Sequence, residues 1–310
     1  MNCCNNKPII ELGAGEKLCK LHFTEYFEGK VFRTIRQFGL IEKEEHLGIA
    51  LSGGKDSLTL LHILKKLSAE NPKIRLSALA INEGIHGYRN KTLITAREFC
   101  EKNGIPLHVH SFKDEFGMSL DDALKTLDVK PCTICGVFRR YLLNKKSKEL
   151  KFTKLATGHN LDDECQSIMM NQFRNSIRAS ARLGPKVGIK SNDKFVQRIK
   201  PLYLCTEKEV ALYAMINNLL DDFNECPNVS KSYRAQVRDM LNDFEKDNQG
   251  TKYSIVNSFL QTLPELKAKF NHEELNSCTE CGEPSSKDKC NACRFAERLK
   301  KAELKPHPSL

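Results

Sequence analysis

Long apolar segments are missing from this chain of 310 residues. No run approaches the ~18–20 apolar residues needed to span a bilayer. The first residues, MNCCNNKP, lack the charged stretch and apolar core of a secretory signal. Repeats and low-complexity tracts are also missing. We therefore expect a cytoplasmic protein without membrane contact, built from one large domain or from a central domain with small appendages.

The overall composition is that of a basic globular protein. Hydrophobic residues make up 40% and charged residues 28% of the sequence, which is ordinary for a folded domain. The formal net charge of +10 favours polyanionic partners such as RNA. Charge alone does not separate an RNA-binding protein from other basic proteins.

Thirteen cysteines are present, and several are closely spaced. Without a secretion signal, such pairs indicate metal ligation over disulfides. The segment CTECGEPSSKDKCNACRF has the spacing C-x2-C-x8-C-x2-C and predicts a closed zinc ribbon on Cys278, Cys281, Cys290 and Cys293. The basic residues after it either contact RNA phosphate or form a solvated face.

Strand-like and helical patterns alternate from Leu47 onward. Strands are expected at 47–51, 75–82, 106–112 and 152–158, with helices at about 56–67, 90–103, 120–127 and 160–174. This order predicts a parallel sheet with helices on both faces. From Thr206 onward the pattern is mostly helical, with Thr206 and Glu209 as a capping box and a kink or break at Pro264.

The first strand leads into the turn SGGKDS, residues 52–57. It is not the common P-loop, because Asp56 stands where that motif needs Ser or Thr. The glycine N–H groups and the helix N-terminus still form an anion site. Ser52, Ser57 and Lys55 add donors, and Asp56 is placed to cap the helix or to hold Mg²⁺. The alternative is a plain strand–turn–helix with Asp56 as its cap.

A second cysteine pair occupies the middle of the chain. Cys132 and Cys135 lie in KPCTICGVFRRYLLN, and a C-x2-C pair alone suits redox chemistry, zinc or part of a cluster. With Cys226 of NECPN as third member, the thiolates suit a cubane iron–sulfur cluster with one open iron. The alternative is a paired-cysteine turn and an unrelated buried cysteine. We interpret Cys100, Cys165 and Cys205 as small buried hydrophobic residues.

Two motifs together resemble the N-type ATP pyrophosphatases, which split ATP between its α- and β-phosphates. SGGKDS resembles their PP-loop, and ATGHNLDDE, residues 156–164, resembles their second nucleotide-facing element. With CxxCGxxRR, ECPN and the terminal cysteines, the chain from Cys3 to Arg298 resembles the TtuA/NcsA branch of tRNA 2-thiouridine synthetases. This resemblance implies an α/β PP-loop fold with a parallel sheet and small N- and C-terminal zinc-binding modules. The expected units are a zinc module at 1–25, a catalytic domain at 26–270, the ribbon at 271–300 and a tail at 301–310.

The resemblance also implies the site residues. ATP and Mg²⁺ would be bound by Ser52, Gly53, Gly54, Lys55, Asp56, Ser57, Ile81, Gly158 and Asp163, and a [4Fe–4S] cluster by Cys132, Cys135 and Cys226. Asp163 would be the acidic partner in catalysis, and Asp162 and Asp163 would orient metal or substrate, unless the acids after Asn160 are only a favourable first helical turn. Arg139 stands where TtuA-type members have a lysine, so it would stabilise charge and not move a proton.

A second zinc ion is implied near the N-terminus. The family pattern is C-x2-C followed by C-x2-H, and CKLH supplies Cys19 and His22. Cys4 falls at another ligand position. Cys3 must then complete the site from a neighbouring position, or the site is incomplete.

The implied reaction is adenylation of a uridine C2 oxygen in tRNA, followed by displacement of AMP by sulfur. GVFRR favours the wobble uridine U34 over U54 of the T-loop, and the sulfur donor is sulfide, a persulfide or a thiocarboxylated carrier protein. A homodimer is typical of the resemblance. The alternatives are a PP-loop ligase that uses ammonia and a non-catalytic, zinc-stabilised RNA-binding module. Because the activated uridine must be shielded from water, the glycine turn and the three central cysteines should line one chamber.

Overall fold

The computed structural model describes residues 4–12, 15–189, 193–220, 225–229, 232–272 and 276–303. Its strands are β1 (Pro8–Glu11), β2 (Lys17–Cys19), β3 (Glu45–Ala50), β4 (Ile74–Asn82), β5 (Leu107–Ser111), β6 (Lys154–Ala156), β7 (Gln197–Ile199), β8 (Asn276–Ser277) and β9 (Pro284–Ser285). Its helices are α1 (Lys20–Gln37), α2 (Lys55–Glu70), α3 (Arg89–Asn103), α4 (Phe112–Phe116), α5 (Leu120–Thr126), α6 (Pro131–Glu149), α7 (Leu161–Phe173), α8 (Ile177–Ser180), α9 (Glu207–Ile216), α10 (Tyr233–Asp247), α11 (Thr251–Phe270) and α12 (Asn291–Glu303).

The central sheet is parallel throughout and has the strand order β5-β4-β3-β6-β7. From β3 the chain adds β4 and β5 on one side of the sheet and then β6 and β7 on the other side. The strand order therefore reverses between β3 and β6. In open α/β sheets ligands bind beyond the carboxyl ends of the strands at such a switch point. The turn 52–57 follows β3 and the segment 157–160 follows β6, so both predicted nucleotide elements lie there. The predicted α/β class with a parallel sheet is confirmed.

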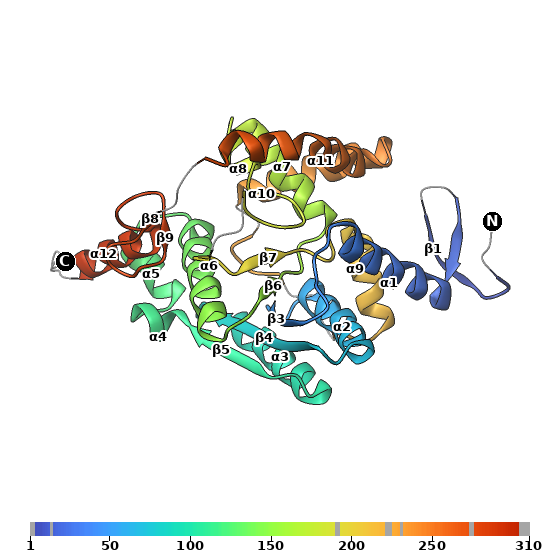
Figure 1. The fold of residues 1–310 in the computed structure, drawn as a ribbon, viewed down its shortest axis with the longest axis horizontal. Helices are drawn as coiled ribbons and strands as arrows, with labels where there is room; N and C mark the ends of the chain where they lie inside the picture. Colours follow the sequence, from blue (N-terminus) through green and yellow to red (C-terminus); the bar gives the residue numbers. More distant parts are fainter. Residues whose placement is uncertain are drawn as a thin grey trace.

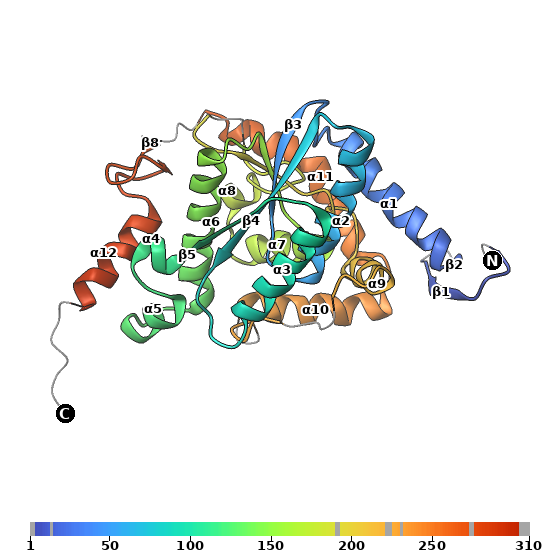
Figure 2. The same ribbon diagram turned by 90° about the horizontal axis from the view of Figure 1, so that it is seen from below.

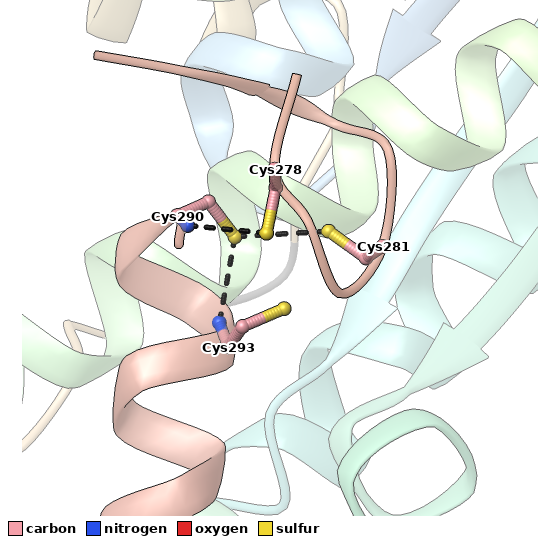
Figure 3. Close-up of side chains that lie close together, drawn as sticks. All are labelled: Cys278, Cys281, Cys290 and Cys293. Carbon is pink, nitrogen blue, oxygen red and sulfur yellow. Dashed lines mark hydrogen bonds between the residues drawn. The ribbon is translucent and has the colours of Figure 1, made fainter. Parts of the chain in front are cut away.

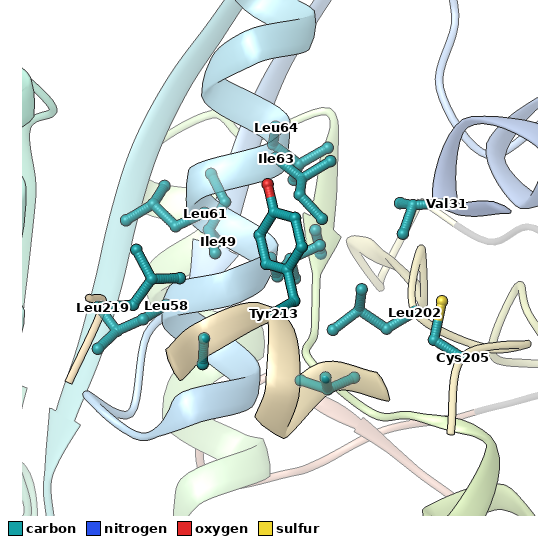
Figure 4. Close-up of a cluster of buried hydrophobic side chains, with 14 of the residues drawn as sticks. Val31, Ile49, Leu58, Leu61, Ile63, Leu64, Leu202, Cys205, Tyr213 and Leu219 are labelled. Atoms are coloured by element: carbon teal, nitrogen blue, oxygen red, sulfur yellow. The ribbon is translucent and has the colours of Figure 1, made fainter. Parts of the chain in front are cut away.

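Each face of the sheet is covered by its own apolar cluster. On one face, β3 packs against α1, α2 and α9 through a cluster that includes Ile49, Leu61 and Tyr213 (Figure 4). On the other face, Leu79 and Leu155 pack against α5, α6 and the ribbon. Burial of Cys100, Cys165 and Cys205 at 1% exposure or less agrees with their interpretation as small hydrophobic residues.

A third cluster joins α7, α10 and α11. The expected break at Pro264 is wrong, because α11 runs through it from Thr251 to Phe270. Proline removes its own N–H from the helix and its ring crowds the carbonyl of residue 260, but Phe259 and Leu263 on the same helix are buried in this cluster. Tertiary packing therefore holds the helix across the proline. The predicted capping box of Thr206 and Glu209 is present at the start of α9.

The two ends of the chain form small appendages at opposite ends of the long axis (Figures 1 and 2). The hairpin β1–β2 leads directly into α1, which crosses the unit boundary expected after residue 25. At the other end, β8, β9 and α12 form the ribbon, and α12 continues past residue 300. In the part of the chain that the structure covers, no helix is both long enough and apolar enough to cross a membrane.

Candidate active site

The turn after β3 forms a compact anion cradle at the N-terminus of α2. Ser57 Oγ accepts from the Ser52 N–H at 3.2 Å and lies 3.1 Å from Ser52 Oγ. The Gly54 N–H donates to Ser52 Oγ at 3.3 Å. Gly53 has φ +82°, and a Cβ added there would lie 1.9 Å from the Thr92 carbonyl oxygen. Only glycine therefore fits the tightest point of the cradle.

Gly53→Ala is expected to destabilise the protein and weaken ATP binding, because both the backbone conformation and the space are wrong for a side chain. The control is Gly117→Ala, whose φ is +83° but whose added Cβ meets nothing within 4 Å. Urea unfolding and ATP titration should show Gly53→Ala to be less stable than Gly117→Ala by roughly 1–3 kcal/mol, with ATP binding lost only in the former. Equal behaviour of the two variants would contradict the cradle assignment.

The second predicted element is packed directly on the first. A Cβ added to Gly158 would lie 2.9 Å from the carbonyl carbon of Asp56 and 3.0 Å from the Ser57 nitrogen. Asn160 Nδ2 donates to Asp56 Oδ1 at 3.0 Å. Two segments about 100 residues apart in sequence thus form one surface at the switch point, as the resemblance implies.

The three acids after Asn160 have different partners. Asp162 accepts from the Glu207 N–H and pairs with Lys252 at 2.6 Å, and Glu164 pairs with Lys200 at 2.5 Å. Asp163 forms a capping box with Asn160, and Arg234 approaches it at 3.7 Å. Asp162 and Glu164 are therefore each paired with a lysine, while the charge of Asp56 in the cradle acts on Asp163.

Asp163 and Lys55 have opposite electrostatic environments. Burial raises the pKa of Asp163 to about 6, against the opposing charge of Arg234, and the nearby Asp56 adds to the rise. Burial opposes the charge of Lys55, but Asp56 and Glu207 outweigh it and raise the pKa of Lys55. Their carboxylates lie 3.2 Å and 3.0 Å from Nζ. A cation is thus held at the cradle, beside a carboxyl group that titrates near neutrality.

The three central cysteines lie near enough to one another for the charges of Cys226 and Cys132 to act on Cys135. Cys132 and Cys135 lie in the first turn of α6, and Cys132 Sγ is 3.7 Å from the Asn228 carbonyl oxygen, two residues after Cys226. Burial raises the pKa of Cys135 to about 11, and Cys226 and Cys132 act on the same thiol. The three sulfurs are not all within 4.8 Å of one another. A cubane binds its cysteines through different irons, so this wider spacing suits a cluster better than a single ion.

A chain of polar contacts runs from the cradle to Arg139 and is buried except at Arg139, whose side chain is 51% exposed. Arg89 donates to the Ser52 carbonyl at 2.7 Å and to the Ile81 carbonyl. Its Nε lies 2.9 Å from Glu83, whose other oxygen lies 3.8 Å from Arg139. Besides burial, which raises the pKa of the Cys135 and Cys226 thiols, the charge of Arg139 lowers it and the charge of Glu83 raises it.

Ile81 itself is 2% exposed, and its carbonyl oxygen accepts a hydrogen bond from Arg89. Its predicted contact with the nucleotide stays a prediction.

Glu83→Gln should be strongly destabilising and should weaken ATP binding, because it leaves Arg89 buried without a counter-charge. Loss of one partner of a buried pair costs about 3–5 kcal/mol. The control is Glu45→Gln, which breaks the equally buried pair with Lys154 at the amino ends of β3 and β6, away from the cradle. Urea unfolding should show a lower free energy of unfolding in both variants. Calorimetric ATP titration should show weaker ATP binding in Glu83→Gln only. An unchanged ATP affinity in Glu83→Gln would contradict the link.

The ribbon cysteines form a compact group. The sulfurs of Cys278, Cys281, Cys290 and Cys293 all lie within 4.8 Å of one another, and Figure 3 shows them facing a common point between the loop and α12. Burial opposes ionisation of Cys278, but backbone N–H groups outweigh it and lower its pKa to about 6. Four thiols at this spacing fit a tetrahedral Zn²⁺ ion. Glu283 joins the ribbon to α6, where it pairs with Lys148 at 3.2 Å.

The N-terminal group contains three of the four predicted ligands. The ligand atoms of Cys4, Cys19 and His22 lie within 4.8 Å of one another, and Cys19 Sγ is 3.3 Å from His22 Nδ1. Cys3 lies outside the described residues. The group therefore fits a zinc ion that takes one further ligand.

Cys278→Ser is expected to remove one zinc ion per chain and to lower the melting temperature, because the short strands β8 and β9 have little core of their own. The control Cys100→Ala removes a buried thiol outside every metal group and should leave the zinc content unchanged. Elemental analysis measures the zinc content of the two variants, and thermal unfolding measures their melting temperatures. Full zinc content in Cys278→Ser would overturn the assignment.

A parallel sheet with this glycine cradle at its switch point defines the class of PP-loop nucleotide-binding proteins, and the PP-loop domain family matches residues 25–244. The chain is 37% identical to "tRNA 2-thiolation protein NcsA" of Haloferax volcanii, over 96% of this chain and 99% of that protein. It is 36% identical to "tRNA-5-methyluridine(54) 2-sulfurtransferase" of Pyrococcus horikoshii, over 95% and 93%. The solved "U34-tRNA thiolase NcsA from Methanococcus maripaludis with its [4Fe-4S] cluster" superposes with a TM-score of 0.83 at 35% identity, over 96% and 95% of the two chains. The chain belongs to the PP-loop family of tRNA 2-thiolation enzymes.

Glu83, Arg89 and His159 were not identified as site residues from the sequence. Glu83 and Arg89 lie between predicted elements in a segment without a motif, and only the fold reveals their pairing. His159 is part of ATGHNLDDE, so its position was a usable signal. Desolvation, followed by the charges of Lys200 and Arg234, lowers the pKa of His159.

Proposed function

We propose that the chain is an ATP-dependent tRNA uridine 2-sulfurtransferase that acts on the wobble uridine U34 and uses a [4Fe–4S] cluster. The observation that supports this proposal is the chain of contacts from Ser52 through Arg89 and Glu83 to Arg139, whose charge acts on Cys135 and Cys226. The U34 thiolase that superposes with this chain contains such a cluster. The family match and the GVFRR segment also support the proposal.

In the proposed reaction, the N–H groups of the cradle and Lys55 hold the phosphates of ATP, with Asp56 as the ligand of Mg²⁺. Asp163 accepts the N3 proton of the uridine, so that O2 attacks the α-phosphate and pyrophosphate leaves onto the cradle. Arg139 stabilises the negative charge that develops at the phosphate. When bound to Cys132, Cys135 and Cys226, the cluster would supply activated sulfur from its open iron. Sulfide attacks C2 and forms the C–S bond as the C2–O bond breaks, and AMP leaves with that oxygen.

Two zinc ions complete the proposed cofactors, on Cys3, Cys4, Cys19 and His22 and on the four ribbon cysteines. The zinc module, catalytic domain, ribbon and tail keep the boundaries expected above, although α1 and α12 each continue across one of them. Thiolate sites of this kind require a reducing compartment, which supports a cytoplasmic location. We propose a homodimer, and a sulfide, persulfide or thiocarboxylate donor.

Mass spectrometry of tRNA from a deletion strain tests the function. We expect 2-thiolation to be lost at U34, kept at U54, and restored when the gene is supplied again. Loss at U54 with U34 intact would instead show the second candidate, for which the similar 2-sulfurtransferase of Pyrococcus horikoshii is the supporting observation. Unchanged thiolation at both positions would overturn the proposal.

A further inference from the structure

A cavity of about 560 Å³ lies between the ribbon and the catalytic domain. Its walls come from three parts of the chain. The helix α6 contributes Arg140, β7 contributes Arg198, and the ribbon contributes Ser285, Ser286 and Lys287. No residue of the cradle and no central cysteine lines it, so it is separate from the site described above.

The cavity carries positive charge that the described chain does not neutralise. Arg140, Arg182 and Arg198 line it, and none of the three guanidinium groups has an acidic partner among the described residues. The lining that the structure describes contains no aspartate or glutamate. Burial, followed by the charge of Arg140, lowers the pKa of Arg198 to about 10. Crowded cations in a desolvated place favour an anionic ligand, and guanidinium groups suit phosphate best.

The same cavity presents an aromatic surface. Phe195 lines it and is 44% exposed. Phe270 and Ile189 also line it. An exposed phenylalanine beside arginines is the combination by which proteins stack an unpaired base and hold its phosphate.

The cavity adjoins the candidate active site. Arg139 and Arg140 are consecutive on α6, the first near Glu83 and the second in the cavity wall. Besides burial, the charges of Arg198 and Arg139 both contribute to lowering the pKa of His159, so both guanidinium groups lie near it. His159 immediately follows Gly158 of the nucleotide element. An RNA strand that entered the chamber would therefore pass along this wall.

We propose that the cavity between the ribbon and α6 receives one nucleotide of the substrate tRNA that flanks the target uridine, with Arg140 and Arg198 on its phosphate and Phe195 against its base. This inference rests on the proposed function. It gives the ribbon a role in recognition, because Ser285, Ser286 and Lys287 close one side of the pocket.

Salt-dependent tRNA binding by Arg198→Gln and Phe195→Ala tests the assignment. Arg198→Gln should weaken tRNA binding about tenfold, because one phosphate contact is lost. For the same reason, the slope of log binding constant against log salt concentration should fall in magnitude by about 1. Phe195→Ala should weaken binding about tenfold with an unchanged slope, because stacking releases no counterion. Phe195 is exposed, so its truncation leaves the fold intact. Lys73→Gln, an exposed lysine that pairs with Glu44 and does not line the cavity, should bind tRNA like wild type.

The outcomes separate this inference from the proposed function. Wild-type tRNA affinity and slope in both variants, with thiolation by the wild-type protein intact, would overturn the cavity assignment alone. A loss of ATP affinity in Arg198→Gln without a change in tRNA binding would also overturn it. Failure of the wild-type protein to bind or thiolate tRNA would overturn the proposed function, and the inference with it.

Discussion

Cys226→Ala is expected to abolish tRNA thiolation while ATP binding stays at the wild-type level. Each of the three cysteines would hold a different iron, so removal of one leaves the cluster without a defined anchor. The cradle residues do not contact Cys226 directly. The link passes through Glu83 and Arg139, and both remain in the variant.

Iron and sulfide content, visible absorption of anaerobically purified protein, and mass spectrometry of the tRNA measure this loss. Cys100→Ala is the matched control, because Cys100 is buried in α3 outside every metal group and should keep both iron and activity. Wild-type thiolation by Cys226→Ala would end the case for a cluster on these residues.

Asp163→Asn should lower the thiolation rate by about 10²–10⁴-fold, which is the usual contribution of a general base. Asparagine keeps an oxygen for the capping box with Asn160, so the start of α7 should persist. With a pKa of about 6, the carboxylate of the wild-type protein ionises as the pH rises through 6. The wild-type rate should therefore rise across that range and then level off.

The pH profile distinguishes a general base from a structural residue. In Asp163→Asn the rise through pH 6 should disappear, and the remaining activity should be flat there. The same raised pKa means that ionisation of Asp163 costs folding stability as the pH rises through 6, since its folded-state pKa lies above the ordinary value. A variant that keeps the wild-type profile would show that another group accepts the proton.

The sequence was most informative where chemistry depends on local pattern. The strand before Ser52, the glycine turn and the spacing of Cys278 to Cys293 each lie within one short segment, and the structure forms them as expected. Pro264 was misjudged because helix propensity is local, whereas packing of α11 against α7 is not. Glu83 and Arg89 could not be found, because their function lies in contacts between the ends of β3 and β4 and α6.

The position of α6 has a consequence for how the protein must be assembled. Its first turn holds Cys132 and Cys135, its middle holds Arg139, and Lys148 near its end contacts Glu283 of the ribbon. The helix thus connects the central cysteines rigidly to the ribbon, so a tilt at one end displaces the other. A ribbon that folds late, or that loses its ion, would leave the thiol pair misaligned even though every residue of the reaction centre is intact.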